Sequence, residues 1–341
     1  MGPKPSAPFQ GQFVQQQVTA LAPLKPGYHF MRWHTDSRLN QLIKYPLFLL
    51  DFIARYLFSR RKYDILHVHF FYPTIWLALL YRALRNPAAK IIVTCHGSDI
   101  YKYQPPGKLY RWCAAKVDHW VFTSAALQQR FCLPSRHSTV LSAGIADSFA
   151  AQRQLDMAAK TIDVLYVGSL DYNKGIDRLI ALLPKLSGKK VVIAGAGPLL
   201  GQLQQVATQY NNVQLLGPQT ASQLAGLYQQ ARCFISLSRN ESFGLVMAEA
   251  MACYTPVIAT GTDGALAQVA DGENGYLVAQ QTDTGPLTEV QIVAALHSAM
   301  QQLWQLSPEG YQQMQLAARH WGEQCLVSDV ATRLQQIYQE V

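Results

Sequence analysis

The residues best suited to chemistry are two glutamates, Glu241 and Glu249, which stand eight positions apart in residues 236–260. On a single helix, a rise of 1.5 Å per residue would separate them by about 12 Å. A close acid–base dyad needs roughly 5–9 Å between its carboxyl groups. The spacing therefore favours two contacts along one elongated polar ligand. The alternative is structural, with one carboxylate near a helix N-terminus and the other in solvent.

A glycine-rich turn supplies a second candidate. Residues 168–175, Gly-Ser-Leu-Asp-Tyr-Asn-Lys-Gly, follow an expected strand and open an expected helix. Backbone N–H groups at such a turn, together with Lys174, can hold a phosphate. Gly195 and Gly197 form a similar turn after the next strand, although that pattern alone is a weak signal. The alternative for Lys174 is a solvated lysine at the start of a helix.

Histidines supply a third candidate. His96 and Gly97 end an expected strand, where the sites of α/β proteins form, although a lone histidine is more often structural. Asp99 follows close behind. His67 and His69 alternate along another expected strand and are predicted to point to opposite faces, which would exclude a metal pair. The sequence contains no Asp-x-Asp motif, which argues against a divalent metal that bridges a diphosphate.

Alternating strands and helices must position these residues. Around Glu241 the pattern is strand, polar loop, helix and strand, which is half of a doubly wound unit. Strand–helix alternation at this spacing predicts parallel sheets. Strands are expected at 28–33, 64–69, 90–95, 119–123, 139–142, 163–167, 190–194, 213–216, 233–236, 257–259 and 276–278, with helices at 13–21, 38–62, 74–84, 124–131, 243–251 and from 291 onward.

Length and composition indicate a globular chain. At 341 residues, 49% hydrophobic and 15% charged, it can form two α/β domains of ordinary size. The six cysteines form no C-x-x-C pair and are interpreted as free thiols in a reducing cytoplasm. No run of 18 uncharged apolar residues and no basic-then-apolar N-terminal pattern occurs, so secretion is not expected.

Charge is unevenly distributed. Residues 1–150 hold 18 Lys and Arg against 6 Asp and no Glu, a formal charge of +12, whereas residues 151–341 carry −4. The N-terminal half is therefore expected to meet something anionic. No nucleic-acid motif is present. An anionic membrane surface or a phosphorylated lipid-linked acceptor fits this charge.

The helical stretch 38–62 is nearly all apolar between residues 45 and 58 and ends in Arg60-Arg61-Lys62. It could be an interfacial membrane helix. The preferred interpretation is a buried domain helix with cations favoured at its C-terminus.

Glu241-x7-Glu249, with Ser236 before it and Pro256-Val-Ile-Ala after it, resembles the donor-site signature of retaining GT-B glycosyltransferases of family 4. The resemblance extends over most of the chain. It implies an α/β GT-B fold, in which two doubly wound Rossmann-like domains face across a cleft and a C-terminal helix crosses back to the N-terminal domain. The expected domains are an acceptor-binding domain (1–150), a nucleotide-sugar-binding domain (151–325) and that helix (326–341).

The same resemblance assigns roles to individual residues. Catalytic roles fall on His96, Lys174 and Glu241. Binding of the nucleotide-sugar donor is expected from Gly168, Ser169, Lys174, Gly195, Gly197, Glu241, Ser242, Phe243, Gly244, Leu245 and Glu249, and contacts on the acceptor side from Gly11, Gly97 and Asp99. No metal and no cofactor is expected.

Two departures from the family pattern stand out. The family usually carries Gly-Arg-Leu-x3-Lys-Gly, and Ser169 stands where the arginine is common. Either Lys174 works with a helix N-terminus alone or another basic residue substitutes. In addition, Gly11 matches the loop after the family's first strand, yet no strand precedes it. That strand is central in a doubly wound sheet, so its absence would leave a gap in the sheet. The hypothesis is that the protein begins about ten residues upstream of Met1.

The implied reaction moves a sugar from a nucleotide-diphosphate sugar to an acceptor hydroxyl with retention of configuration. The expected setting is synthesis of bacterial surface polysaccharide, lipopolysaccharide or a lipid-linked glycan, in the cytoplasm or peripherally at the inner face of its membrane. No nucleic-acid partner is expected. Two rivals are a nucleotide-sugar epimerase or hydrolase on the same fold and a catalytically silent GT-B-like binding subunit.

Overall fold

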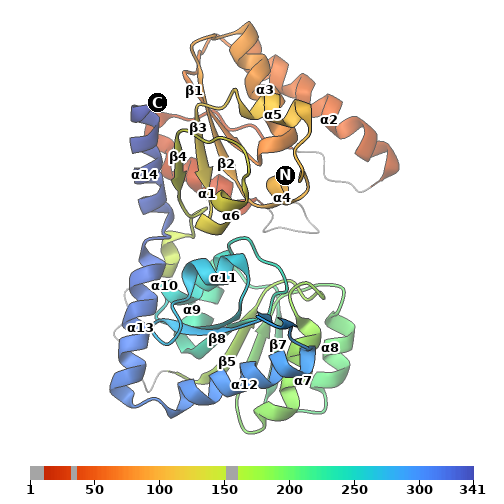
Figure 1. Cartoon of the computed structure of the whole chain (residues 1–341), viewed down its shortest axis with the longest axis vertical. Helices are drawn as coiled ribbons and strands as arrows, with labels where there is room; N and C mark the ends of the chain where they lie inside the picture. Colours follow the sequence, from red (N-terminus) through yellow and green to blue (C-terminus); the bar gives the residue numbers. More distant parts are fainter. Residues whose placement is uncertain (1–10, 32–36, 151–159) are drawn as a thin grey trace. The chain divides into compact units, whose positions relative to one another are not determined.

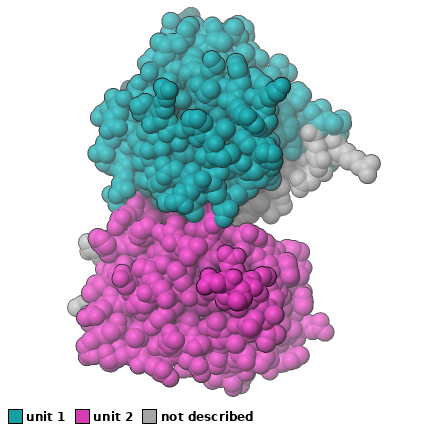
Figure 2. Space-filling view, viewed as in Figure 1, with its two compact units in different colours: residues 1–144, 327–341 teal, residues 145–326 magenta. Residues whose placement is uncertain are grey.

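Parallel strands followed by helices build both halves of the chain in a computed structural model that describes residues 11–31, 37–150 and 160–341 (Figure 1). The chain divides into two units. Unit 1 holds residues 1–144 and 327–341, and unit 2 holds residues 145–326 (Figure 2). The first boundary lies six positions before the one expected at 150, and the C-terminal helix belongs to unit 1.

Unit 1 is built on a four-stranded parallel sheet in the order β1-β2-β3-β4. Apolar side chains from α3, α5 and α6 pack on one face of this sheet, and those from α1 and α14 pack on the other. A sheet covered on both faces needs strands that are apolar throughout, and β2 and β3 are buried along almost their whole length. The elements are β1 (Ile65–His69), β2 (Lys90–Cys95), β3 (His119–Phe122), β4 (Ser138–Val140), α1 (Gln12–Ala20), α2 (Arg38–Phe52), α3 (Phe71–Leu84), α4 (Ser98–Tyr101), α5 (Lys108–Ala114), α6 (Ala125–Arg130) and α14 (Val327–Glu340).

One edge of the sheet, along β1, differs from the expectation. The strand predicted at 28–33 is wrong where it can be checked, because residues 28–31 have no regular structure and residues 32–36 lie outside the described part of the chain. Strand β1 pairs only with β2 among the described residues. In a parallel ladder, only alternate residues of a strand form backbone hydrogen bonds with a given neighbour. Asp64 and Phe70 bond to β2. The backbone groups of the residues between them in this alternation therefore point to the outer edge, and these residues are Ile65, His67 and His69.

The predicted helix at 38–62 forms, but the interpretation of a buried helix is wrong. Helix α2 continues as a short π-helical turn, Ile53–Leu57. Among its described side chains, Phe52 packs against the rings of Tyr56 and Tyr81, and Asn40 is also buried. The opposite side exposes large apolar residues. Apolar composition alone did not reveal that this helix has two apolar sides and only one partner.

Unit 2 contains a six-stranded parallel sheet in the order β10-β9-β8-β5-β6-β7. Alternate residues of β5 enter the cores on the two faces: Val164 and Tyr166 pack with α7, α8 and α12, whereas Leu165 and Val167 pack with α9 and α10. The elements are β5 (Ile162–Val167), β6 (Val191–Ala194), β7 (Val213–Gly217), β8 (Ala231–Ser236), β9 (Val257–Thr260), β10 (Gly275–Val278), a hairpin of β11 (Gln281–Thr282) and β12 (Gly285–Pro286), α7 (Ile176–Leu182), α8 (Leu200–Ala207), α9 (Ala221–Gln230), α10 (Leu245–Ala252), α11 (Asp263–Gln268), α12 (Glu289–Gln305) and α13 (Pro308–Glu323).

The strand order of unit 2 contains a topological switch point between β5 and β8. From β5 the chain moves outward to β6 and β7 on one side, then returns to build β8, β9 and β10 on the other. The loops that leave β5 and β8 therefore diverge, and ligands of open α/β sheets bind in the crevice between such loops. These two loops carry Lys174 and Glu241.

Candidate active site

The structure brings Lys174 and Glu241 together. Lys174 lies on the turn after β5, Glu241 lies on the loop after β8, and the lysine Nζ forms an ion pair with the glutamate Oε2. Both side chains keep contact with solvent, with 29% of the lysine and 16% of the glutamate side chain exposed. The pair therefore offers a cation and a carboxylate side by side to a ligand at the switch point.

Hydrogen bonds of the backbone hold the two loops that carry this pair. The Lys174 amide donates to Asp171 Oδ1 at 2.9 Å, which shapes the turn. The Arg239 amide donates to the carbonyl of Asn173 at 2.7 Å. A side chain at Gly175 would overlap the carbonyl oxygen of Leu237, and its φ of 73° also favours glycine. The two loops consequently behave as one packed layer.

The two glycine turns that the sequence singled out lie against each other. The Leu170 amide donates to the Ala196 carbonyl at 2.9 Å. A Cβ at Gly195 would overlap the carbonyl of Gly168, and a Cβ at Gly197 would overlap the backbone of Leu170. Glycine is therefore needed here for close approach of two backbones. Gly168 follows β5, and Gly195 and Gly197 follow β6; their direct contact with a ligand stays a prediction.

Glu249 lies on α10, about one turn from the start of that helix. Tyr228 Oη donates to its Oε2 at 3.1 Å. Burial raises the pKa of the Glu249 carboxyl to about 7, and the Tyr228 hydrogen bond opposes this shift only in part. A carboxyl group with this pKa lies close to half protonation at neutral pH and can both donate to and accept from hydroxyl groups.

The start of α10 carries the remaining predicted donor contacts. Gly244 is its N-cap with a φ of 81°, and a Cβ there would press on the side chain of Glu241. Ser242, Phe243 and Leu245 surround this cap. The amide of Gly264 donates to the Glu241 carbonyl at 2.8 Å, which ties the loop to α11. Amides at a helix start attract anions.

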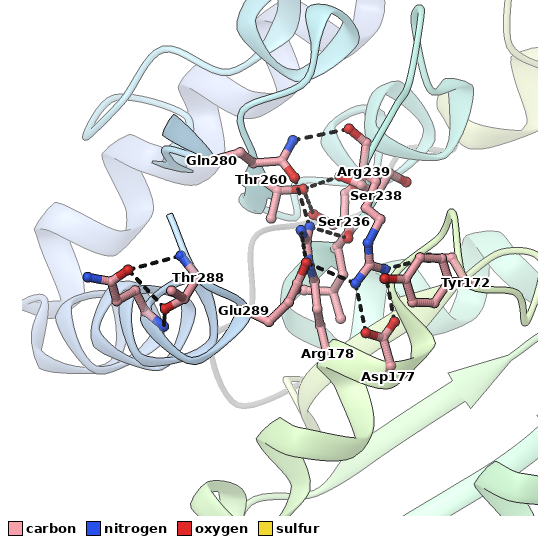
Figure 3. A network of polar contacts seen from close by, with 12 residues as sticks. Tyr172, Asp177, Arg178, Ser236, Ser238, Arg239, Thr260, Gln280, Thr288 and Glu289 are labelled. Atoms are coloured by element: carbon pink, nitrogen blue, oxygen red, sulfur yellow. Dashed lines mark hydrogen bonds and ion pairs between the residues drawn. The ribbon is translucent and has the colours of Figure 1, made fainter. Parts of the chain in front are cut away.

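An ionic network that sequence reasoning missed braces both loops (Figure 3). Arg239 donates to Asp177 Oδ1 and Oδ2 at 2.9 and 2.7 Å, and its guanidinium stacks 3.7 Å from the centre of the Tyr172 ring. Arg178 is 3% exposed and donates to both carboxylate oxygens of Glu289 at 2.6 and 3.1 Å. Bidentate arginine–carboxylate pairs fix orientation as well as energy.

The arginines and carboxylates of this network stabilise each other's charged forms. Hydrogen bonds from Arg178 hold the pKa of Glu289 below its usual value against the effect of burial. Burial alone would raise the pKa of Asp177, but its bonds with Arg239 outweigh burial and lower the pKa. The Arg239 guanidinium is thus occupied by contacts within the protein. While it keeps these contacts, it does not replace the arginine that the family usually carries at the position of Ser169.

In unit 1, His96 lies at the end of β2 between two aromatic rings. Its ring centre is 4.9 Å from that of Phe13 and 4.4 Å from that of Phe70. Its Nε2 lies 3.1 Å from Nδ1 of His69, at the end of β1. Burial first, and then the neighbouring His67, lower the pKa of His96 to about 3. His96 is therefore neutral at physiological pH.

The prediction that His67 and His69 point to opposite faces is wrong. Their rings stack with centres 4.5 Å apart, because residues two apart on a strand share a face. His67 bonds through Nδ1 to Tyr338 Oη at 2.6 Å and through Nε2 to Thr94 Oγ1 at 2.7 Å. His69 was missed as a partner of His96, although the ends of β1 and β2 are neighbours in the parallel register.

The three acceptor-side predictions fall at different places in unit 1. Gly11 is the N-cap of α1 with a φ of 72°, and Gly97 is the N-cap of α4 with a φ of 101°. Asp99 is 2% exposed, and its carboxylate accepts from the amides of Phe71 and His96 at 2.9 and 3.0 Å. This geometry gives Asp99 a structural task, which is to hold the backbone that carries His96.

Two family models match consecutive parts of the chain. Glycosyltransferase Family 4 matches residues 14–149, and Glycosyl transferases group 1 matches residues 147–290. The chain belongs to glycosyltransferase family 4. The ion pair and glycine turns of unit 2 lie inside the second match, and His96 lies inside the first.

Curated relatives share the family over part of their length. The gpi3 subunit of phosphatidylinositol N-acetylglucosaminyltransferase from Schizosaccharomyces pombe is 30% identical over 170 residues, which is 46% of this chain and 37% of that protein. D-inositol 3-phosphate glycosyltransferase from Mycolicibacterium smegmatis is 40% identical over 124 residues, 34% of this chain and 28% of that protein. The matches thus span about a third of each relative.

Solved structures share the GT-B glycosyltransferase fold. Sucrose-phosphate synthase from Thermosynechococcus elongatus superposes with a TM-score of 0.75 at 22% identity, over 98% of this chain and 94% of that one. HepE from Anabaena, in complex with UDP and glucose, superposes with a TM-score of 0.66 at 16% identity, over 91% and 85% of the two chains. The fold predicted from the sequence is confirmed.

Two absences hold for residues 11–31, 37–150 and 160–341, the part of the chain that the structure describes. In that part of the chain, no three or more His, Cys, Asp or Glu side chains are grouped to hold a metal ion. Nor does any described helix combine the length and apolar character needed to cross a bilayer.

Proposed function

We propose that the protein is a retaining glycosyltransferase that uses a nucleotide-diphosphate sugar and needs no metal. The observation that supports this function is the Lys174–Glu241 pair on the two loops that diverge at the switch point of unit 2. Family membership and the UDP-bound state of the HepE structures support a nucleotide-sugar donor. The proposal assigns Lys174 to the diphosphate and Glu241 to the sugar hydroxyls.

The proposed reaction exchanges one bond at the anomeric carbon. The bond from that carbon to the diphosphate oxygen breaks, a bond to the acceptor oxygen forms, and the acceptor proton passes to the leaving phosphate. Negative charge grows on the diphosphate as the first bond breaks. Lys174 and the amides of Phe243, Gly244 and Leu245 would stabilise that charge, and one preorganised contact of this kind is worth about 3–4 kcal/mol.

Other residues would position the substrates. Glu249 would hold the ribose hydroxyls, which suits a carboxyl group with a pKa of about 7. Gly168, Ser169, Gly195 and Gly197 would bring backbone close to the nucleotide. The family resemblance gives His96 a contact with the sugar, and its neutral imidazole can donate to or accept from a hydroxyl group.

The proposed acceptor is a surface polysaccharide, lipopolysaccharide or lipid-linked glycan made at the cytoplasmic face of a membrane. Unit 1 contains a cavity of about 1060 Å³ beside the outer edge of β1. Aromatic residues from α2, including Phe48 and Phe52, line it together with Arg61 and Lys62. An apolar wall with nearby cations suits a phosphorylated lipid carrier. Gly11 also lines this cavity.

Ligand-dependent melting identifies the donor. Because a ligand that binds the folded state raises its melting temperature, we expect one of the UDP-, GDP- or ADP-sugars to shift the transition. The matched donor is then incubated with lipid-linked and free glycan acceptors. Product of retained anomeric configuration, read by proton NMR, supports the proposal. Turnover of the donor without any acceptor would indicate an epimerase or hydrolase, and binding without turnover would indicate a silent subunit.

A further inference from the structure

Helix α2 exposes a stripe of large apolar side chains. Leu39, Leu42 and Leu50 are 67%, 75% and 60% exposed, and Ile43 and Leu49 are 40% and 39% exposed. These five positions recur at helical spacing and therefore share one side of α2, and Leu49, at the edge of that side, also lines the cavity of unit 1. Single exposed apolar residues need no explanation, but a contiguous stripe indicates an interaction surface. We name residues 39, 42, 43, 49 and 50 the α2 stripe.

The stripe is not a core face turned outward. The inward face of this segment is a different one, because Phe48 stacks on His29 at 4.5 Å, Phe52 packs against Tyr81 of α3, and both phenylalanines line the cavity of unit 1. An ordinary surface helix carries polar residues opposite its buried side. Helix α2 carries leucines there, so its sequence provides for a second apolar partner.

The charges around the stripe are almost all positive. Residues 37–62 contain six Lys and Arg and a single acidic residue, Asp51, which is paired with Arg55 at 2.6 Å. Arg60, Arg61 and Lys62 follow the helical segment after two intervening residues and are exposed. An apolar helix side flanked by cations is the chemistry of a helix that lies in a membrane interface.

We propose that the α2 stripe docks on an anionic lipid bilayer, with the leucines in the acyl boundary and the cations at the headgroups. A second copy of the chain fits less well, because both copies would bring this positive charge to one interface. The inference deepens the membrane location given under the proposed function. It can be tested without donor or acceptor, so its failure and the failure of the transferase proposal can be told apart.

The test is co-sedimentation of the full chain with vesicles of phosphatidylcholine alone or mixed with phosphatidylglycerol. We expect binding to the anionic vesicles that weakens as salt rises. The triple variant Leu39→Gln, Leu42→Gln, Leu50→Gln should lose affinity about tenfold or more. The triple variant Arg60→Gln, Arg61→Gln, Lys62→Gln should lose affinity for anionic vesicles about 100-fold and leave binding to neutral vesicles unchanged.

A matched control tests whether exposed apolar residues elsewhere on the protein would bind vesicles equally well. Leu266, Val290 and Leu316 in unit 2 are 63%, 80% and 47% exposed, and their replacement by Gln should leave vesicle binding unchanged. Wild-type protein that stays in the supernatant overturns the proposal, as does equal binding by the α2 and control triples. Concentration-dependent self-association that depends on Leu42 and Leu50, with no vesicle binding, would assign the stripe to a second copy instead. Circular dichroism of each variant checks that it is folded.

Discussion

Lys174 and Glu241 are 67 residues apart in the sequence and form an ion pair where the loops after β5 and β8 diverge. Each comes from a motif that the sequence singled out for its chemistry, and each keeps part of its surface in solvent. The two charges satisfy each other. A diphosphate would compete with Glu241 for the lysine, and the carboxylate would then be available for neutral hydroxyl groups.

Arg239 should be needed for this arrangement, although its side chain bonds to Asp177 and Glu289 and not to the pair itself. Arg239→Lys removes the bidentate contact with Asp177 and the flat stacking on Tyr172. We expect a loss of about 1–2 kcal/mol in the free energy of unfolding, measured in urea. We also expect kcat to fall while KM for the donor changes little, because the loop would hold Glu241 less firmly in the transition state. An unchanged kcat would show that Arg239 contributes to the stability of the fold but not to catalysis.

Glu249 should make stability depend on pH. Its pKa is about 7 in the folded state and near 4.3 when unfolded. Between these two pKa values the carboxyl group is protonated in the folded state and ionised in the unfolded state. The stability that this group contributes is therefore fully present below the unfolded pKa and is lost as the pH rises through 7. The variant Glu249→Gln should therefore gain about 2–3 kcal/mol relative to wild type between about pH 5 and pH 8. Urea unfolding at both pH values measures this, and a pH-independent difference would contradict it.

His96 should stay neutral across the physiological range. Its pKa is lowered to about 3, so its imidazole should show no titration in NMR spectra between about pH 5 and pH 8. A His96→Asn variant assigns the signal. Because the unfolded histidine has a higher pKa, its contribution to stability is present above about pH 6.5 and declines as pH falls below that value. A midpoint for His96 near 6.5 would refute the buried environment described here.

The close approach of the two glycine turns predicts a strong local effect. Gly195→Ala places a Cβ on the carbonyl of Gly168 and should cost about 2–4 kcal/mol of stability. Gly201 lies in α8 with open space around it, so Gly201→Ala should be neutral or stabilising by up to about 1 kcal/mol. Melting temperatures compare the two, and equal shifts would contradict this account of the turn.

Most strands were predictable because buried parallel strands have a simple apolar pattern. Ten predicted strands formed within a few residues of their predicted positions, and the Lys174 and Glu241 loops followed from two of them. Residues 28–31 were mispredicted because apolar residues there line a cavity without joining the sheet. Local patterns identify a strand's residues but not whether a neighbouring strand is present to pair with it.

Contacts between distant residues could not be read from the sequence. Arg178 and Glu289 are 111 positions apart, and Arg239 and Asp177 are 62 positions apart. Single charged residues of this kind usually lie in solvent. The partnership of His69 with His96 could have been found, because both end adjacent strands and β-strand geometry places His67 and His69 on one face.

The most direct test of the account measures transfer kinetics of three variants. Lys174→Met and Glu241→Gln should each lower kcat by about 10²–10³-fold, since each removes a preorganised contact with developing charge or with the sugar. Lys185→Met, an exposed lysine elsewhere in unit 2, serves as the control and should retain wild-type kinetics. Wild-type turnover by folded Lys174→Met and Glu241→Gln enzymes would contradict the proposed site.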